Sequence, residues 1–254
     1  MKYHLDTIPV WDAYHEDSEC PFCILEYNTE QSYVSSFLGA SVMEPATRIQ
    51  VNEKGFCARH NTLLYHAQNR LGLALLTHTH ALETIHRINE KNEKLYKSIR
   101  SPEKTPQPLI KKISGRQAAL QHSLDHLIEC IREHLNNCVI CDRIQYSLNR
   151  YAYTVIHLWE NDNDFQEVFR KSKGFCFSHF PLVLNMSAQQ LSRKKLTEFL
   201  KEALSLQQEN LNRLEKELYW FTQKFDYQNQ EKPWGNSRDA LPRMLQKLTG
   251  KIME

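Results

Sequence analysis

Apolar residues recur at steps of three or four along most of this chain. In residues 144–158 the large side chains with this spacing are Ile144, Leu148, Tyr151, Val155 and Leu158. Residues 196–225 repeat the pattern with a long row of leucines that ends in phenylalanines. Such spacing places side chains on one face of an α-helix, whereas a half-buried strand alternates apolar and polar residues. No alternating pattern competes with the helical one, and we therefore expect an all-α fold.

Local signals in the second half predict where helices begin. The run of Asn and Asp at residues 161–164 interrupts the helical pattern and offers N-caps to a shorter helix through Phe165 and Phe169. Ser187 and Gln190 have the spacing of a capping box, which predicts the start of the long leucine-rich helix. The second half is therefore expected to contain three helices.

The first half has the same plan. A helix is expected after Cys23, a short one over residues 45–51 and a single long one over residues 60–95. In the second half, the leucine seam over residues 196–225 can pack against its own half or pair with another chain. Packing within its own half is the simpler interpretation, because an amphipathic helix usually buries its apolar stripe in its own core.

A repeated motif of cysteine and histidine marks both halves. The first copy reads Cys-x-x-Cys at residues 20–23 and Gly-Phe-Cys-x-x-His at residues 55–60. The second copy has the same two parts at residues 138–141 and 174–179. Between the second and third cysteines lie 33 residues in the first copy and 34 in the second. This matched spacing indicates an internal duplication.

The segments between and after these motifs suggest the domain organisation. Residues 101–108 contain three prolines together with Ser and Lys, which is typical of a linker. Residues 233–236, Pro-Trp-Gly-Asn, form a turn signal, and a short helical pattern follows over residues 241–248. We predict four segments: a first metal-binding helical repeat (1–98), a linker (99–112), a second metal-binding helical repeat (113–230) and a C-terminal tail with a short helix (231–254).

The repeated cysteines and histidines have the spacing of metal ligands. Two sulfurs three residues apart converge at the start of a helix, and Cys-x-x-His does the same for a sulfur and an imidazole. Three thiolates and one imidazole form a recognised tetrahedral zinc set. We therefore predict two Cys3His sites, with one Zn²⁺ in each. The eight predicted ligands are Cys20, Cys23, Cys57 and His60 in the first half, and Cys138, Cys141, Cys176 and His179 in the second.

Each site is expected to close within its own half. The helix after each Cys-x-x-Cys would lead away from the site, and the short helix would lead back toward it. The Gly-Phe-Cys segment would then lie beside the Cys-x-x-Cys of the same half. The metal would then pin the beginning of the third helix to the beginning of the first. Gly55 and Gly174 would let the backbone turn tightly before a ligand. Phe56 and Phe175 would either cover the site or fill the core.

The sequence leaves the ion open between zinc and an iron–sulfur cluster. Zinc is favoured, and three thiolates with one His can also hold a cluster. Small buried cysteines without metal are a weaker interpretation. A thioredoxin-like redox role for Cys20 and Cys23 lacks the βαβ context that it needs. Four protein ligands leave no open position for water or substrate, which argues against a zinc enzyme.

Two further groups contain histidines. One matches half of the Glu-x-x-His motif of di-iron bundles, without a second copy, and we favour a solvated or partly packed polar face. Its members are His78, His80, Glu83 and His86. The other precedes the second Cys-x-x-Cys at steps of four, where only neighbouring side chains meet on a straight helix. Its members are His122, His126, Cys130 and His134, and Cys130 is the seventh cysteine, without a counterpart in the first half. Cys130 could bind a second ion weakly with His126 or with His134, and we favour a chance alignment on the helix that leads into the second Cys-x-x-Cys.

Charge and composition exclude some functions. The formal net charge is +2, and two zinc sites, each contributing −1, would bring it near zero. Such a chain has no electrostatic footprint for nucleic acid. The N-terminus lacks the apolar core of a signal peptide, and the apolar stretches are too short to span a bilayer. We expect a cytoplasmic protein, in whose reducing surroundings seven cysteines favour metal binding over disulfides.

Longer stretches resemble an uncharacterised bacterial family that is catalogued as a domain of unknown function. The similar segments are residues 5–14, 17–23, 51–60, 69–75, 138–142, 173–179, 225–227 and 241–250. The resemblance spans nearly the whole chain and implies that the eight predicted ligands are family features. It implies no activity.

A binding or scaffold module with structural zinc sites is the preferred function, because two closed sites accompany no recognisable catalytic constellation. An iron–sulfur or thiol-based redox or sensor protein with the same ligands is the first alternative. An enzyme with a pocket between the repeats is a weaker one. A protein partner fits the scaffold interpretation, and the sequence defines neither a substrate nor an oligomeric state.

Overall fold

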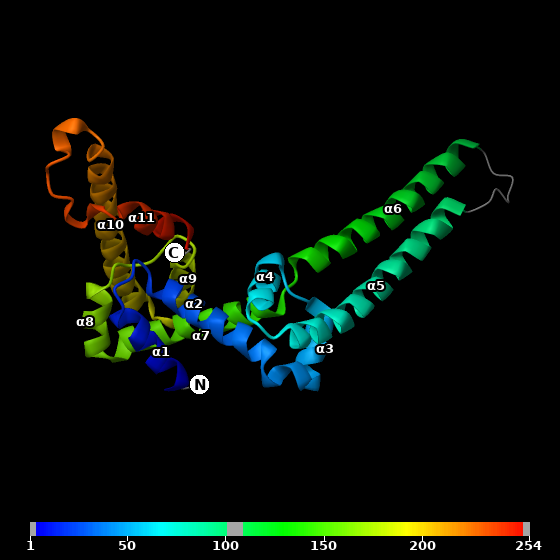
Figure 1. Cartoon of the computed structure of the whole chain (residues 1–254), viewed down its shortest axis with the longest axis horizontal. Helices are drawn as coiled ribbons and strands as arrows, with labels where there is room; N and C mark the ends of the chain where they lie inside the picture. The colour runs from blue at the N-terminus through cyan, green and yellow to red at the C-terminus, as the bar shows by residue number, and fades with distance from the viewer. Residues whose placement is uncertain (1–3, 101–108, 251–254) are drawn as a thin grey trace. The chain divides into compact units, whose positions relative to one another are not determined.

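The computed structural model describes residues 4–100 and 109–250, and every regular element in these ranges is helical (Figure 1). The first elements are α1 (His4–His15), α2 (Pro21–Leu38), the 3-10 helix η1 (Ala40–Met43), α3 (Pro45–Lys54), α4 (Ala58–His66) and α5 (Arg70–Arg100). The later ones are α6 (Leu109–Asn136), α7 (Val139–Asn161), α8 (Asn163–Lys171), α9 (Phe180–Gln190), α10 (Arg193–Gln223), the 3-10 helices η2 (Tyr227–Asn229) and η3 (Gly235–Ser237), and α11 (Ala240–Thr249). The expected all-α fold is confirmed.

Two further expectations concern the linker and membrane-spanning segments. The proline-rich part of the predicted linker, residues 101–108, lies outside the described residues. Within the described ranges, no helix combines the length and the apolar character that crossing a membrane requires.

The long helix expected over residues 60–95 is two helices, α4 and α5. Between them Gln68 has a φ of 55°. Asn69 fixes the corner: its side-chain nitrogen donates to the Leu38 carbonyl at 2.6 Å, and its oxygen accepts from the Gly72 amide at 2.8 Å. The prediction of a single helix was wrong because apolar spacing continues through the corner, and a local cap can end a helix without disturbing that spacing.

Helix caps in the second half confirm one prediction and correct another. Asp162 caps α8 as expected, and its carboxylate accepts from two backbone amides of the next turn at 3.0 and 3.1 Å. The predicted capping box at Ser187 was wrong. Ser187 lies inside α9 and donates to the Leu184 carbonyl at 2.8 Å. The N-cap of α10 is Ser192, because the tight corner between the two helices falls there.

The order of helices is parallel in the two halves. From α2 to α5 the lengths are 18, 10, 9 and 31 residues, and from α7 to α10 they are 23, 9, 11 and 31 residues. Each half therefore contains four helices after its Cys-x-x-Cys, and not the three that were expected. Structural equivalence of the two halves stays a prediction.

The described chain packs into two compact units. The first unit contains the residues up to Glu30 and those from Ile144 onward, and the second unit contains those from Gln31 to Arg143. Both boundaries fall inside a helix, one in α2 and one in α7. Each unit combines segments from both halves of the sequence, and the predicted division into repeats 1–98 and 113–230 stays a prediction.

Phenylalanine rings fill the core of the first unit. Phe165 and Phe169 of α8, Phe175 before α9 and Phe199 of α10 are fully buried. The centre of the Phe169 ring lies 6.1 Å from that of Phe175 and 5.6 Å from that of Phe199. Tyr14 brings α1 into this core, with its ring 5.0 Å from that of Phe165. Large tilted rings at these separations bury much apolar area, and they fix the segment that carries Cys176.

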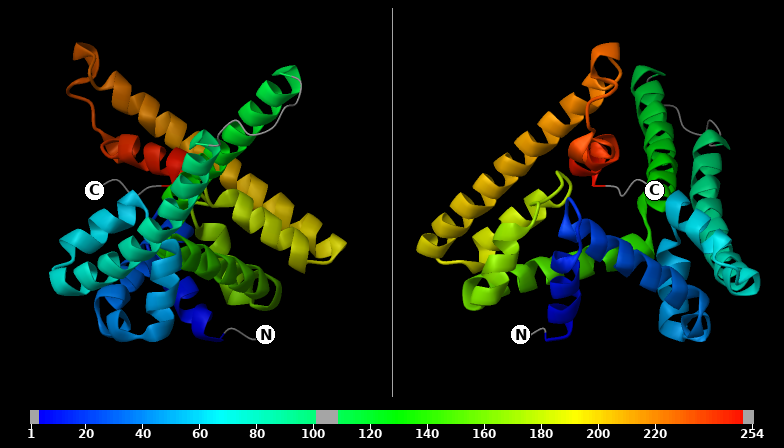
Figure 2. Two further views of the ribbon diagram at one scale, coloured as in Figure 1. Left: turned by 90° about the vertical axis from the view of Figure 1, so that its right-hand side faces the viewer. Right: turned by 60° about the vertical axis from the view of Figure 1, so that its left-hand side comes forward.

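A long helical hairpin dominates the second unit. α5 and α6 run side by side in all views (Figures 1 and 2). Near the base, the His80 and His134 rings stack with centres 5.3 Å apart, and near the tip, the Ser98 and Ser123 hydroxyls lie 2.8 Å apart. This pairing of low with high residue numbers makes the hairpin antiparallel. α3 packs against α5 and ties the hairpin to the rest of the unit.

Candidate metal centres

Four predicted ligands meet in the first unit and form what we call the first site: Cys20, Cys23, Cys176 and His179. Their ligand atoms lie within 4.8 Å of one another, and all four residues are buried. Cys20 and Cys23 converge because they lie just before and within the first turn of α2, where the Cys23 amide donates to the Cys20 carbonyl at 3.0 Å. The other two ligands converge in the same way, since the His179 amide donates to the Cys176 carbonyl at 3.2 Å.

The remaining four ligands meet in the second unit and form the second site: Cys57, His60, Cys138 and Cys141. Its ligand atoms are also within 4.8 Å of one another, but it is less covered than the first site. His60 and Cys138 are buried, Cys57 is half-buried and Cys141 is exposed. An oxidant or a chelator in solution can therefore reach the second site more readily.

The ligand separations suit a tetrahedral ion. Zn–S bonds of about 2.3 Å and a Zn–N bond of about 2.0–2.1 Å place two sulfurs about 3.8 Å apart, and a sulfur and a nitrogen about 3.6 Å apart. In the first site, the sulfurs of Cys23 and Cys176 are 3.7 Å apart, and the His179 Nδ1 lies 3.2–3.8 Å from the three sulfurs. In the second site, the sulfurs of Cys57 and Cys141 are 3.8 Å apart, and the His60 Nδ1 lies 3.2–3.4 Å from the three sulfurs.

The grouping of ligands corrects the expectation that each half closes its own site. The Cys-x-x-Cys of each half meets the Cys-x-x-His of the other half. Helix lengths give the reason. At 1.5 Å per residue, α2 is about 27 Å long and α3 only about 15 Å, so α3 is too short to bring the chain back to the start of α2. The same holds for α7 and α8, at about 34 and 14 Å.

The two glycines before the ligands have the predicted role. Gly55 has a φ of 65° and Gly174 a φ of 74°, values in the region that favours glycine. A Cβ on Gly55 would overlap the His80 ring, and one on Gly174 would lie 2.9 Å from the Gln207 Oε1. Gln207 also donates to the Phe175 carbonyl at 2.9 Å and accepts from the Phe175 amide at 3.0 Å. A side chain from α5 or α10 thus holds each Gly-Phe-Cys turn at close range.

The phenylalanines beside the ligands differ in their surroundings. Phe175 is fully buried, and its ring centre lies 5.9 Å from that of Phe22. Phe56 is half-buried, and its ring meets that of Phe37 edge-on at 5.4 Å. Both rings therefore pack in apolar surroundings next to their sites, in keeping with the core role that was one of the two expectations.

A carboxylate orients the histidine of the first site. The Glu26 Oε2 lies 3.3 Å from the His179 Nε2, while the His179 Nδ1 faces the sulfurs. A metal-bound His commonly donates its second ring N–H to a carboxylate, which fixes the tautomer and raises the basicity of the ligand nitrogen. Glu26 stands three residues after Cys23, and the corresponding position after Cys141 is Ile144. No sequence motif marks Glu26, and its position one turn after Cys23 is the only signal that points to it.

The end of α11 covers the first site. The Phe177 amide donates to the Lys247 carbonyl at 2.9 Å, and the Ser178 hydroxyl donates to the Thr249 carbonyl at 2.8 Å. A Cβ on Gly250 would lie 3.2 Å from the Cys176 sulfur. The short helix expected in the tail is confirmed over Ala240–Thr249, and its contact with a ligand loop was not expected.

Lys247 connects both ligand loops of the first site from inside. Its side chain is fully buried, and its Nζ donates to the backbone carbonyls of Glu19 and Lys173, the former at 2.7 Å. Burial lowers the pKa of Lys247, while Glu19 and the Cys20 thiolate act in the opposite direction. A Zn²⁺ with three thiolates and a neutral His has a net charge of −1, which a buried ammonium at this position offsets.

Ion pairs surround this lysine in the first unit. The carboxylate of Glu19 is buried and accepts from Arg213 at 2.7 and 2.9 Å and from Arg243 at 3.3 Å. Arg243 also donates to Glu217 at 2.6 Å. Glu19 directly precedes Cys20, so a network of hydrogen-bonded charges fixes the first ligand against α10 and α11. Removal of one partner would leave a buried charge without compensation.

The thiols of the first site influence one another strongly. Hydrogen bonds from Cys20 and Cys23 lower the pKa of the Cys176 thiol, and the hydrogen bond to Cys176 raises the pKa of the Cys23 thiol far above its usual range. Burial opposes protonation of His179, but its hydrogen bonds to Cys176 and Cys20 raise its pKa to about 12. Three sulfurs this close ionise together only when a cation is present, which is the charge state that a metal site supplies.

In the second site the pKa values of neighbouring thiols are also shifted in opposite directions, by less than in the first site. Burial disfavours the Cys138 thiolate, but the hydrogen bond from His60 and backbone amides lower the pKa of Cys138 to about 6. Burial and the nearby Cys138 thiolate raise the pKa of Cys141. The segment is held by an ion pair between Lys54 and Asp142 at 2.5 Å and by a hydrogen bond from the Val139 amide to the Gly55 carbonyl at 3.1 Å.

The histidine group on α5 does not converge. His78, Glu83 and His86 are exposed, and His86 pairs with Glu90 at 3.9 Å. Only His80 packs inward, where its Nδ1 lies 2.9 Å from the Asn52 carbonyl oxygen. These side chains therefore form the solvated, partly packed face that the sequence favoured.

The group on α6 separates in a similar way. The His122 and His126 Nε2 atoms approach to 3.2 Å on the exposed face, whereas His134 stacks on His80. Cys130 is a free, half-buried thiol. Burial lowers the pKa of His134, and the neighbouring His80 and Arg87 act in the same direction. Neither Cys130 nor His134 joins a metal-binding group of three or more ligands among the described residues.

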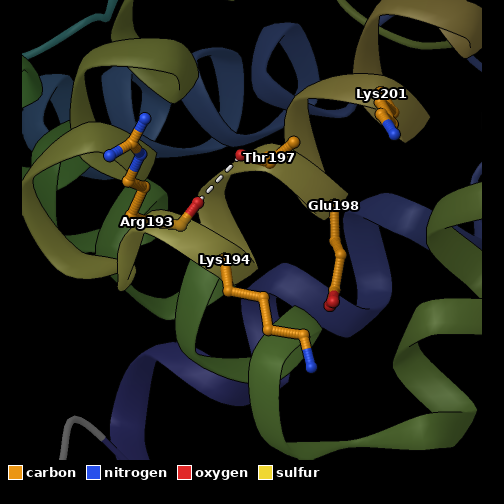
Figure 3. A pocket seen from close by; sticks show the side chains of 5 residues that line it. All are labelled: Arg193, Lys194, Thr197, Glu198 and Lys201. Carbon is orange, nitrogen blue, oxygen red and sulfur yellow. Dashed lines mark hydrogen bonds between the residues drawn. The ribbon is translucent and has the colours of Figure 1, made fainter.

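A shallow hollow on α10 adds no candidate chemistry. Figure 3 shows the five side chains that line it, all from one helix: Arg193, Lys194, Thr197, Glu198 and Lys201. Thr197 donates to the backbone carbonyl of Arg193 at 2.9 Å, and the charged side chains point in different directions. Their charged ends do not converge on a common point.

The fold and the clusters define an all-helical protein with two groups of Cys and His that could hold metal ions. The model of one family, described as a family of unknown function (DUF6062), matches residues 1–254, and the chain belongs to this family. No curated protein and no solved structure matches the chain. The resemblance noted from the sequence is thereby confirmed.

Proposed function

We propose that this protein is a zinc-binding helical module in which two Cys3His sites have a structural role and the helices serve as a binding or scaffold surface. The observation that carries the proposal is the meeting of all eight ligands in two groups of four, each with separations close to those of tetrahedral zinc.

The donor set favours zinc over harder cations. Three sulfurs and one imidazole nitrogen are soft or intermediate ligands, whereas Mg²⁺ and Ca²⁺ prefer oxygen. Glu26 does not disturb this set, because it faces the Nε2 of His179 and not the sulfurs. A buried positive charge on Lys247 further suits a site whose net charge with Zn²⁺ is −1.

A structural role follows from what each site connects. The first site joins residues that are more than 150 positions apart, Cys20 and His179, and the second joins Cys57 to Cys141 across 84 positions. A metal that closes such long loops restricts the unfolded chain strongly, and its binding free energy becomes folding free energy. Four protein ligands also leave no position for substrate.

One observation favours a second candidate function, a thiol-based or iron–sulfur redox sensor at the second site. Cys141 is exposed and Cys57 is half-buried, so an oxidant can reach these sulfurs, while those of the first site are covered. Exposed sulfurs are the ones that an oxidant in solution reaches first.

The compartment and the origin of the two halves are part of the same proposal. All seven cysteines are free, which suits a reducing, cytoplasmic environment. The parallel order of helices from α2 to α5 and from α7 to α10 supports a duplication. With swapped metal ligands, the two copies would depend on each other for folding.

Elemental analysis of untagged protein purified without oxygen tests the proposal. We expect two zinc ions per chain and no visible absorption. Iron with inorganic sulfide and a brown colour would favour the redox candidate. Metal-free protein with all thiols reactive, and with unchanged helix content, would refute both.

A further inference from the structure

An exposed pair of histidines on α6 is separate from both cysteine sites. His122 and His126 are four positions apart, which places them one turn apart on the same face of the helix. Their Nε2 atoms approach to 3.2 Å, and the ring centres lie 4.3 Å apart with an angle of 81° between the rings. Two ring nitrogens are thus presented side by side at the surface of the second unit.

The separation of the two nitrogens fits neighbouring positions around one metal ion. Two metal–nitrogen bonds of about 2.0–2.1 Å place the nitrogens about 3.3 Å apart at the tetrahedral angle. At the right angle that Cu²⁺ and Ni²⁺ prefer, the same bonds place them about 2.9 Å apart. The observed 3.2 Å lies between these values. A hydrogen bond between the two rings suits the same distance, and binding measurements separate the two states.

The surroundings leave room for an ion and favour its positive charge. Side chains on a helix lean toward its N-terminus, and the residues one turn before His122, at positions 118–119, are exposed alanines. Glu129 and Glu133 continue the row of the two histidines at steps of three and four, and both are exposed. Arg132 lies 4.0 Å from Glu129 and offsets part of its charge. The remaining negative charge on this face attracts a cation.

An ion on this pair would have open coordination positions. Among the described residues, His122 and His126 belong to no group of three or more possible ligands. Water or a ligand from solution would therefore complete the coordination, unlike at the two cysteine sites, where four protein ligands close it. Imidazole nitrogens suit transition metals such as Cu²⁺, Ni²⁺ and Zn²⁺, whereas Mg²⁺ and Ca²⁺ prefer oxygen ligands.

We propose that His122 and His126 form a third metal site, which binds a divalent transition ion reversibly through two imidazole nitrogens. Cu²⁺ should bind most tightly, as in most sites with nitrogen ligands. Two protein ligands hold this ion, so it exchanges readily, while each zinc is held by four. The proposal does not depend on the zinc sites, because the pair contains none of the eight predicted ligands.

Equilibrium dialysis of the full, zinc-loaded chain against Ni²⁺ tests the proposal, with nickel and zinc content measured together. Ni²⁺ is the probe because Cu²⁺ oxidises free thiols. We expect one nickel ion per chain and no loss of zinc. His122→Ala and His126→Ala should each lower the nickel affinity on the order of 100-fold, because the second ring of a chelating pair binds within the same molecule.

Absorption spectra locate the nickel. Thiolate-bound nickel has strong charge-transfer bands in the near ultraviolet, and imidazole-bound nickel has none, so we expect no such bands. Nickel that enters the cysteine groups, as a failure of the zinc proposal would allow, is therefore recognised separately. Nickel in the cysteine groups would also be insensitive to His122→Ala and His126→Ala, since neither residue belongs to those groups.

Two matched controls define the geometry of the site. His78→Ala removes an exposed histidine that has no histidine three or four positions away, and it should leave the nickel affinity unchanged. Gln121→His combined with His122→Ala keeps the number of histidines but sets the two rings five positions apart, about 140° around the helix. This variant should bind nickel as weakly as His122→Ala.

Two results would overturn the proposal. The first is a wild-type chain that takes up no nickel outside the cysteine groups, which would leave only a hydrogen bond between the two rings. The second is a Gln121→His/His122→Ala variant that binds nickel as tightly as wild type, which would assign the binding to exposed histidines in general and not to this pair.

Discussion

The Nζ of Lys247 lies 2.7 Å from the backbone carbonyl oxygen of Glu19, and the side chain of Lys247 is fully buried. Through this bond, and a second one to the Lys173 carbonyl, α11 holds the segments that lead into Cys20 and Cys176. A helix near the end of the chain therefore stabilises the first site without contributing a ligand.

Lys247→Met should destabilise the first unit. The substitution keeps the apolar stem but leaves two carbonyls and the Glu19 carboxylate with one donor fewer, and a buried group that loses its partner costs about 1–3 kcal/mol. Urea unfolding measures the loss. The same change at the exposed Lys216 is the control and should have an effect below about 0.5 kcal/mol. Equal stability of the two variants would show that the buried lysine does not hold the loops.

Alanine substitutions at three glycines should separate backbone strain from steric overlap. Gly235 has a φ of 56°, and no atom lies within 4 Å of the position that a Cβ would take, so Gly235→Ala should cost only the strain of about 1–2 kcal/mol. Gly55→Ala and Gly174→Ala add overlap with His80 or Gln207 and should cost more. Thermal unfolding of the three variants gives the order. If Gly235→Ala were the most destabilising, close packing around the ligand turns would be excluded.

Glu26→Gln should weaken zinc binding at the first site alone. A carboxylate that accepts from a ligand histidine contributes on the order of 10-fold to 100-fold in metal affinity. Chelator competition measures the affinity most clearly in a Cys141→Ala background, where only the first site is complete. The exposed Glu16→Gln is the control. Unchanged affinity in Glu26→Gln would mean that the pair with His179 has no role in orienting the ligand.

Cys57→Ala should unfold or loosen the second unit while the first unit keeps its zinc. Metal binding energy is folding energy, so the loss of one ligand should cost several kcal/mol in that unit. Cys130→Ala is the matched control, because Cys130 is free and belongs to neither site. Hydrogen exchange resolved along the chain reports on both units. Identical exchange in Cys57→Ala and wild type would contradict a structural role for the second site.

The sequence was sufficient to predict the all-α class and the eight residues that converge, because both depend on local spacing. Steps of three or four residues report a helix, and Cys-x-x-Cys brings two sulfurs together at a helix start in almost any surroundings. The break at Gln68 and the false cap at Ser187 were missed because they depend on side-chain partners, such as the contact of Asn69 with Leu38.

The pairing of ligands could not be predicted from the motifs. Each Cys-x-x-Cys had two possible partners of equal chemistry, and nothing in the motifs disfavoured the nearer one. The lengths of α2 and α3 decide which motifs meet. A sequence pattern does not locate the end of a helix to within one turn, so it does not predict these lengths closely enough. The role of Lys247 was hidden for a different reason, since it acts on backbone carbonyls that no sequence pattern records.

Zinc content of two double variants tests whether each site takes ligands from both halves of the chain. Cys23→Ala with Cys176→Ala removes two ligands of one site and should leave one zinc per chain. Cys23→Ala with Cys57→Ala removes one ligand from each site and should leave none tightly bound. The opposite result, with one zinc retained in Cys23→Ala/Cys57→Ala and none in Cys23→Ala/Cys176→Ala, would show that each half closes its own site and that the exchanged pairing is wrong.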